Sequence, residues 1–138
     1  MKKLFFTTII LINILYANDY DKAIDLYKQN KFKEAAQYFI TSANNGNSEA
    51  AYIMGYFYTG GIGVKQDLKK SVKWYEKAAK QGHINAQVNL GWDYIGGLGV
   101  KVDYKKAAYW IKKAKQQGSQ KAQTLWNEFN LTKYDTME

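Results

Sequence analysis

The sequence predicts an all-α fold, a right-handed solenoid of antiparallel helix pairs, on three observations. Residues 50–85 align without a gap with residues 86–121, and sixteen of the 36 aligned pairs are identical. Each aligned unit carries helix start and stop residues at matched places. The composition, 46% hydrophobic and 16% aromatic, is too apolar for a disordered chain. A period of this length is typical of stacked supersecondary units.

The N-terminal residues have the pattern of a secretory signal peptide. Lys2 and Lys3 precede an almost wholly apolar run over residues 4–16, and the small residue Ala17 follows. The run is shorter than the roughly 20 residues that span a bilayer. We expect residues 1–17 to be removed near Ala17 and the protein to be periplasmic or secreted, in a bacterium. Leu15 fits the cleavage pattern poorly, so a retained anchor is the open alternative.

Each unit of the repeat predicts two helices. Asp67 and Asp103 are expected N-caps of the second helices, because a carboxylate accepts hydrogen bonds from free backbone N–H groups. Gly82 and Gly118 are expected to end those helices in a left-handed conformation. Two serines are expected to cap the first helices that they begin: Ser48 and Ser119.

Glycine-rich segments join the two helices of a unit. They read T-G-G-I-G-V-K-Q-D at residues 59–67 and I-G-G-L-G-V-K-V-D at 95–103. Their spacing predicts a tight path with positive φ angles, with Ile62, Leu98, Val64 and Val100 holding the loops on the core. Phosphate binding is not expected, because the pattern lacks the third glycine of G-x-G-x-x-G and no strand precedes it.

These motifs resemble the SEL-one-like repeat family, a relative of the tetratricopeptide repeat. Residues 86–118 carry the family's pattern at the following positions: Ala86, Leu90, Gly91, Tyr94, Gly97, Gly99, Val100, Asp103, Lys106, Ala107, Trp110, Lys113, Ala114 and Gly118. Residues 50–82 depart from it mildly at Met54, Ser71 and Val72. The resemblance implies a helical solenoid that serves as a protein-interaction adaptor.

The repeat divides the chain into six segments and predicts about seven helices in three and a half repeats. Residues 18–46 resemble a plain tetratricopeptide unit with a short turn at Asn30-Lys31. The other expected segments are a signal peptide at 1–17, two SEL-one-like repeats at 47–82 and 83–118, a C-terminal capping helix at 119–131 and a flexible tail at 132–138.

Tetratricopeptide geometry places one side of the first helices on a concave surface. The positions expected there are mostly aromatic and nearly uncharged: Tyr20, Ile24, Tyr27, Tyr52, Tyr56, Thr59, Val88, Trp92, Ile95, Thr124 and Glu128. Exposed aromatic surfaces commonly mark partner sites. The sequence therefore predicts a monomeric, non-catalytic module that binds a protein or peptide of the cell envelope along this groove.

The excess of lysine predicts a second, basic surface. The formal net charge is +8, with 20 lysines, no arginine and most lysines on the second helices. We expect a solvated convex face, and the alternative is a peripheral contact with anionic lipid or glycan. Nucleic acid is not an expected partner, because arginine, the main reader of guanine, is missing and the chain is predicted to be exported.

Catalysis is not expected, and neither is a cofactor. The chain has no cysteine and one histidine, His83, which excludes a thiolate zinc site and a two-histidine metal centre. His83 is expected to be a surface loop residue. Some cysteine-rich members of the family are described as penicillin-binding proteins or β-lactamases, so that activity is the alternative. No serine here is followed by lysine three residues later, as the serine-enzyme signature requires.

One modification motif is present near the C-terminus. Asn130 is the acceptor of an N-x-T sequon, Asn130-Leu131-Thr132, with Glu128 two residues before it. This arrangement resembles the extended sequon of bacterial periplasmic glycosylation. We expect an enzyme to reach Asn130 in a flexible C-terminus.

Overall fold

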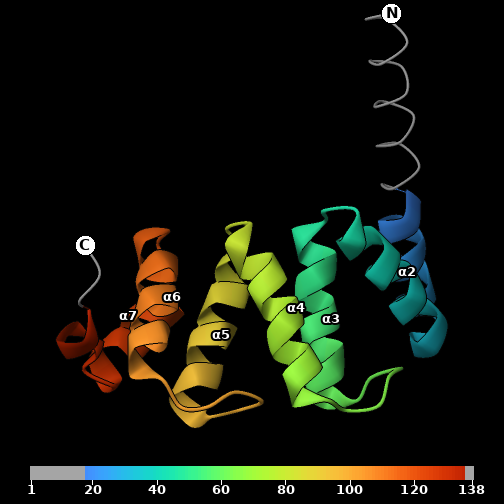
Figure 1. Cartoon of the computed structure of the whole chain (residues 1–138). Coiled ribbons are helices and arrows are strands. Elements are labelled where there is room, and N and C mark those ends of the chain that lie inside the picture. Colours follow the sequence, from blue (N-terminus) through green and yellow to red (C-terminus); the bar gives the residue numbers. More distant parts are fainter. Residues whose placement is uncertain (1–17, 136–138) are drawn as a thin grey trace, which may run out of the picture.

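The structure is a computed structural model that describes residues 18–135, and its helices stand side by side along the chain (Figure 1). Residues 18–28 are helical. The elements that follow are α2 (Phe32–Asn44), α3 (Ser48–Gly60), α4 (Leu68–Lys80), α5 (Ile84–Gly96), α6 (Tyr104–Gln116), α7 (Gln120–Glu128) and the 3-10 helix η1 (Leu131–Tyr134). The predicted all-α solenoid is confirmed, with seven α-helices over residues 18–135. The predicted signal peptide lies outside the described residues.

The helices keep the period of the sequence. The second helices α2, α4 and α6 begin 36 residues apart, and so do the first helices α3, α5 and α7. The first unit therefore differs only in its connection, a short turn at residues 29–31 in place of the glycine loop. No helix within residues 18–135 has the length and apolar character needed to cross a membrane.

Polar N-caps fix the start of each α-helix from α3 to α7. A carboxylate oxygen of Asp67 accepts from the backbone N–H of Lys70 at 3.0 Å, and Asp103 caps α6 in the same way. The predicted cap Ser119 is confirmed for α7. The predicted cap Ser48 is wrong: it is the first helical residue, and Asn47 before it caps α3.

The glycine loops lock each unit to the one before it. Gly63 has a φ of 64° and Gly99 a φ of 73°. A Cβ atom at Gly63 would overlap the carbonyl group of Phe32 at the start of α2, and one at Gly99 would overlap that of Leu68 at the start of α4. Glycine is needed at both places because the backbone takes a left-handed conformation and another backbone lies against it.

The apolar loop residues behave as predicted with one exception. Ile62, Val64 and Val100 pack against the core. Leu98 is 39% exposed, so its predicted packing is wrong. Its side chain instead lies over Gly96 of the preceding helix.

The C-terminal residues are folded further than predicted. Leu131 is fully buried, and the Lys112 ammonium lies 2.9 Å from an Asp135 carboxylate oxygen. The rings of Tyr104 and Tyr134 stack with centroids 5.0 Å apart. A flexible tail from residue 132 is therefore wrong for residues 132–135, because η1 closes the last core cluster; residues 136–138 lie outside the described range.

Candidate functional site

Exposed aromatic side chains gather on the first helices. We call the surface of the helix at residues 18–28, α3, α5 and α7 the first-helix face. Tyr27, Tyr56 and Trp92 are 40%, 51% and 44% exposed. Tyr56 and Trp92 lie at the same place in successive units, 36 residues apart, so the two rings occupy equivalent positions along the stack.

An apolar pocket of about 180 Å³ opens on this face between the first and second units. Its lining residues come from the helix at 18–28, α2 and α3: Ile24, Tyr27, Phe39, Ile53, Tyr56 and Phe57. The sequence predicted Ile24, Tyr27 and Tyr56 for the groove. It missed Phe39, Ile53 and Phe57, whose apolar side chains do not by themselves distinguish a pocket wall from the core.

Other predicted groove residues are only partly exposed. Tyr20 packs edge-on against Phe39 with ring centroids 5.9 Å apart, and burial raises its pKa. Tyr52 is half-buried and stacks on the ring of His83 at 4.6 Å. Much of the surface of both tyrosine side chains is therefore buried in contacts within the stack.

Two predicted groove residues are buried, so their expected exposure is wrong. Val88 is 1% exposed and Ile95 is 8% exposed. Val88 belongs to the core cluster that α7 completes, because a residue at that position packs against the following unit. Ile95 belongs to the main core cluster. The predicted Thr124 and Glu128 are exposed on α7.

Thr59 has an exposed surface, but its hydroxyl is engaged inside its own unit. Its Oγ1 lies 2.7 Å from Oγ of Ser71, and Ser71 donates to the carbonyl of Gly55 at 2.8 Å. These bonds join α3 to α4. They also place the Ser71 hydroxyl in a buried structural role.

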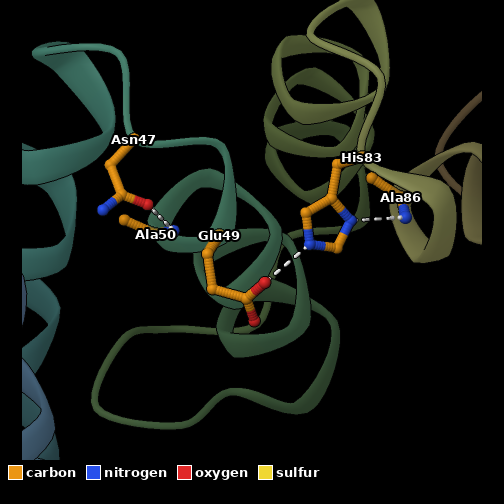
Figure 2. A network of polar contacts seen from close by, with 5 residues as sticks. All are labelled: Asn47, Glu49, Ala50, His83 and Ala86. Atoms are coloured by element: carbon orange, nitrogen blue, oxygen red, sulfur yellow. Dashed lines mark hydrogen bonds and ion pairs between the residues drawn. The ribbon is translucent and has the colours of Figure 1, made fainter.

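His83 joins two units, as Figure 2 shows. Its Nδ1 accepts from the backbone N–H of Ala86 at 3.2 Å, which caps α5. Its Nε2 therefore carries the proton and donates to Oε2 of Glu49 on α3, at 2.8 Å. The expected loop position between α4 and α5 is confirmed. The expected surface exposure is wrong, because the imidazole side chain is only 12% exposed. The capping role of His83 could have been predicted from the repeat, because His83 lies 36 residues after Asn47, the cap of α3.

Asp93 is the main residue that the sequence reasoning missed on this face. It is 9% exposed, and its Oδ2 has no hydrogen-bond partner within residues 18–135. Burial raises the pKa of its carboxyl from 3.8 to about 7. In the repeat alignment it replaces Phe57, a pocket residue, and that exchange of an apolar for a charged residue was visible in the sequence.

The sequence of the Sel1 repeat matches this chain at residues 16–29, 27–47, 48–83 and 84–119. The chain belongs to the Sel1 repeat family. Proteins of the Sel1 repeat family are generally protein-interaction modules built as non-catalytic scaffolds. No curated protein matches the chain.

Solved Sel1 and SLR structures share the fold. The chain is 34% identical, over 78% of its length, to a protective antigen of uropathogenic Escherichia coli strains with an SLR fold, at a TM-score of 0.74. It is 36% identical, over 70% of its length, to a Sel1 repeat protein from Oxalobacter formigenes, at a TM-score of 0.68. It spans 24% and 28% of those two chains.

A third similar structure is Helicobacter pylori cysteine rich protein B. It has 22% identity and a TM-score of 0.66, and 80% of this chain covers 93% of it. At that identity the likeness shows the helical solenoid fold alone. The present chain contains no cysteine.

The second helices of this Sel1 repeat protein carry a separate basic surface. Lys70, Lys73 and Lys77 line an open pocket of about 360 Å³ around Trp74. The Lys77 ammonium lies 5.2 Å from the centroid of the Trp74 ring, within the range of a cation–π contact. Residues 18–135 contain no group of three or more side chains suited to a metal ion.

The predicted acceptor Asn130 lies in folded structure. It has a φ of 47° and precedes η1. Thr132 of the same sequon accepts a hydrogen bond from Nε1 of Trp126 at 3.1 Å. The expected flexible setting is therefore wrong, although Asn130 itself is exposed.

Proposed function

We propose that this Sel1 repeat protein is a non-catalytic adaptor of the bacterial cell envelope that binds a peptide segment of a partner protein along its first-helix face. One observation carries the proposal: the exposed rings of Tyr56 and Trp92 recur at equivalent positions of successive first helices, and Tyr56 borders an apolar pocket. Aromatic side chains of this kind are favoured anchors of protein interfaces.

The pocket fits one apolar side chain of such a segment. Its volume of about 180 Å³ suits a leucine, a methionine or a phenylalanine. Burying a side chain of that size contributes about 1.5–3 kcal/mol. The exposed rings of Tyr56 and Trp92 would then cover the neighbouring residues of the segment, in an extended or a helical conformation.

Substitution at the two exposed rings tests the face. The purified protein and its Tyr56→Ala/Trp92→Ala variant are compared in capture of binding proteins from the native envelope, with binding measured by titration. Both side chains are about half exposed, so circular dichroism should be unchanged. We expect binding at least about tenfold weaker, as for the loss of central aromatic anchors. Unchanged binding would contradict the assignment of the face.

The envelope location is a separate part of the proposal, supported by the basic start and apolar run of residues 1–17. Fractionation of the native host, followed by N-terminal sequencing of the recovered protein, tests it. We expect a periplasmic or secreted chain that begins near residue 18, and a full-length cytoplasmic chain would contradict it. A full-length chain in the membrane fraction would indicate a retained anchor.

The lysines around Trp74 favour a second candidate function, a contact with an anionic envelope lipid or glycan. Three lysines line one open pocket with an aromatic ring, which offers charge and a stacking surface together. Vesicles with and without phosphatidylglycerol test it: binding that requires the anionic lipid and disappears in Lys73→Gln/Lys77→Gln supports this candidate. Equal binding to both vesicles would exclude it.

The non-catalytic part of the proposal has its own test. The alternative is the β-lactamase-like activity described for cysteine-rich relatives. Nitrocefin is the probe, and we expect no turnover by the purified protein. Turnover that is lost on unfolding would contradict an adaptor without covalent chemistry.

A further inference from the structure

The positions equivalent to three walls of the apolar pocket hold polar side chains one unit further along the stack. Three of its walls are Phe39, Ile53 and Phe57. Their equivalents 36 residues later are, in that order, Tyr75, Asn89 and Asp93. Because α2, α3, α4 and α5 keep the same period, these polar side chains occupy between the second and third units the places that the apolar ones occupy between the first and second.

Asp93 is the charged member of this second set, and no ion pair within residues 18–135 includes it. The residue is nine-tenths buried, and its Oδ2 has no hydrogen-bond partner within the same residues. A buried carboxylate without a partner carries a large desolvation cost. No hydrogen bond or ion pair within residues 18–135 offsets this cost, so the carboxylate is available to pair with a ligand.

The distribution of charged residues indicates that this ligand is a cation. The second helices α4 and α6 hold five lysines each, whereas α3 and α5 hold none. Asp93 also lies in the last turn of α5, where the backbone carbonyls of a helix favour a positive charge. Its neighbour in the chain, Trp92, is exposed, and the face of an indole ring attracts cations.

We propose that Asp93 selects the partner by pairing with a lysine or arginine side chain of the bound peptide, while an apolar side chain of the same peptide fills the pocket at Ile24 and Tyr56. The inference rests on the proposed function, because it assumes that the first-helix face binds a peptide. It adds the chemical class of the partner: a segment with one basic and one apolar anchor at a fixed spacing.

Selection of peptides from a library tests the inference. Phage-displayed random dodecapeptides are panned on the purified protein, on Asp93→Asn, which has nearly the same shape, and on the matched control Glu34→Gln, which removes an exposed carboxylate of α2 outside the first-helix face. We expect the wild type and Glu34→Gln to enrich peptides with a lysine or arginine at a fixed distance from a large apolar residue. Asp93→Asn should keep the apolar preference and lose the basic one.

A double-mutant cycle measures the pair directly. An enriched peptide and its lysine-to-norleucine analogue are titrated against the wild type and Asp93→Asn. For the wild type, we expect the analogue to bind at least about tenfold more weakly than the parent peptide. For Asp93→Asn, we expect the two peptides to bind equally well, because the coupling is confined to the charge pair. An equal loss in both proteins would overturn the inference even if Asp93→Asn were perturbed elsewhere.

The remaining outcomes separate this inference from the proposed function. Peptides with an apolar anchor but no basic preference would overturn the role of Asp93 and leave the first-helix face intact. Peptides that bind Tyr56→Ala/Trp92→Ala as tightly as the wild type, or no enrichment on any protein, would contradict the proposed function and this inference with it.

Discussion

Nε2 of His83 lies 2.8 Å from Oε2 of Glu49, and this hydrogen bond ties the start of the third unit to the first helix of the second. The same imidazole caps α5 through Nδ1 and stacks on Tyr52. One side chain thus combines a local role, capping the start of a helix, with a contact between repeats. Asn47 and Ser119, its equivalents, perform only the capping task among the side-chain hydrogen bonds of residues 18–135.

Substitution at this position separates the two tasks. His83→Ala removes the cap and the contacts with Glu49 and Tyr52, and we expect it to lower the free energy of unfolding by about 2–3 kcal/mol. His83→Asn restores a cap of the kind that Asn47 provides and should recover about 1 kcal/mol of that loss. Urea unfolding followed by circular dichroism measures both. Equal stability of the two variants would show that the cap contributes nothing.

Glycine-to-alanine substitution should destabilise the protein more in a glycine loop than at the end of a second helix. Gly63→Ala places a Cβ against the backbone carbonyl of Phe32 and should lower the free energy of unfolding by about 2–4 kcal/mol. Gly82→Ala is the matched control, because Gly82 also has a positive φ but open space where a Cβ would lie. It should cost only about 1–2 kcal/mol for the left-handed conformation. Similar losses would contradict the close contact between loop and helix.

Asp93 predicts a pH dependence of stability. Because its carboxyl pKa rises from 3.8 unfolded to about 7 folded, the folded state holds this proton more tightly. The contribution to stability is therefore full below pH 3.8 and is lost as the pH rises through about 7. We expect Asp93→Asn to be more stable than the wild type by about 1–3 kcal/mol at pH 8, with the difference closing toward pH 4. Urea unfolding at several pH values checks this, and a difference independent of pH would contradict it.

Salt distinguishes the two candidate surfaces. A partner held by an apolar pocket and a buried ion pair is screened little, so its dissociation constant should change by less than about threefold between 50 and 500 mM NaCl. A contact through the exposed lysines near Trp74 should weaken much more. Titration of the captured partner over this range decides between them. Steep weakening would favour the lysine surface.

The period of the sequence predicted most of the fold. Asp67 and Asp103 correctly predicted the starts of two second helices. An N-cap acts within its own helix turn, so its prediction requires no knowledge of contacts distant in the sequence. The first-helix cap was misplaced from Asn47 to Ser48 because either residue can accept the hydrogen bond. Leu98 was misjudged because loop burial depends on the whole path of the loop.

The candidate site was less predictable, because exposure depends on neighbouring units. Tyr56 and Trp92 were predicted on the surface and are exposed. Val88 has the same helical phase as Tyr52, yet α7 completes the core around it, which a single helix pattern does not reveal. The exchange of Phe57 for Asp93 was visible in the repeat alignment. Its burial without a hydrogen-bond partner for Oδ2 within residues 18–135 depends on packing and was not visible there.

The most direct test of the first-helix face is photo-crosslinking in the native host. A benzoylphenylalanine residue is placed at position 56, on the first-helix face, or at position 73, among the lysines of α4, and the cells are irradiated. We expect a partner adduct from position 56 that is absent from position 73. An adduct from position 73 alone would contradict binding along the first-helix face.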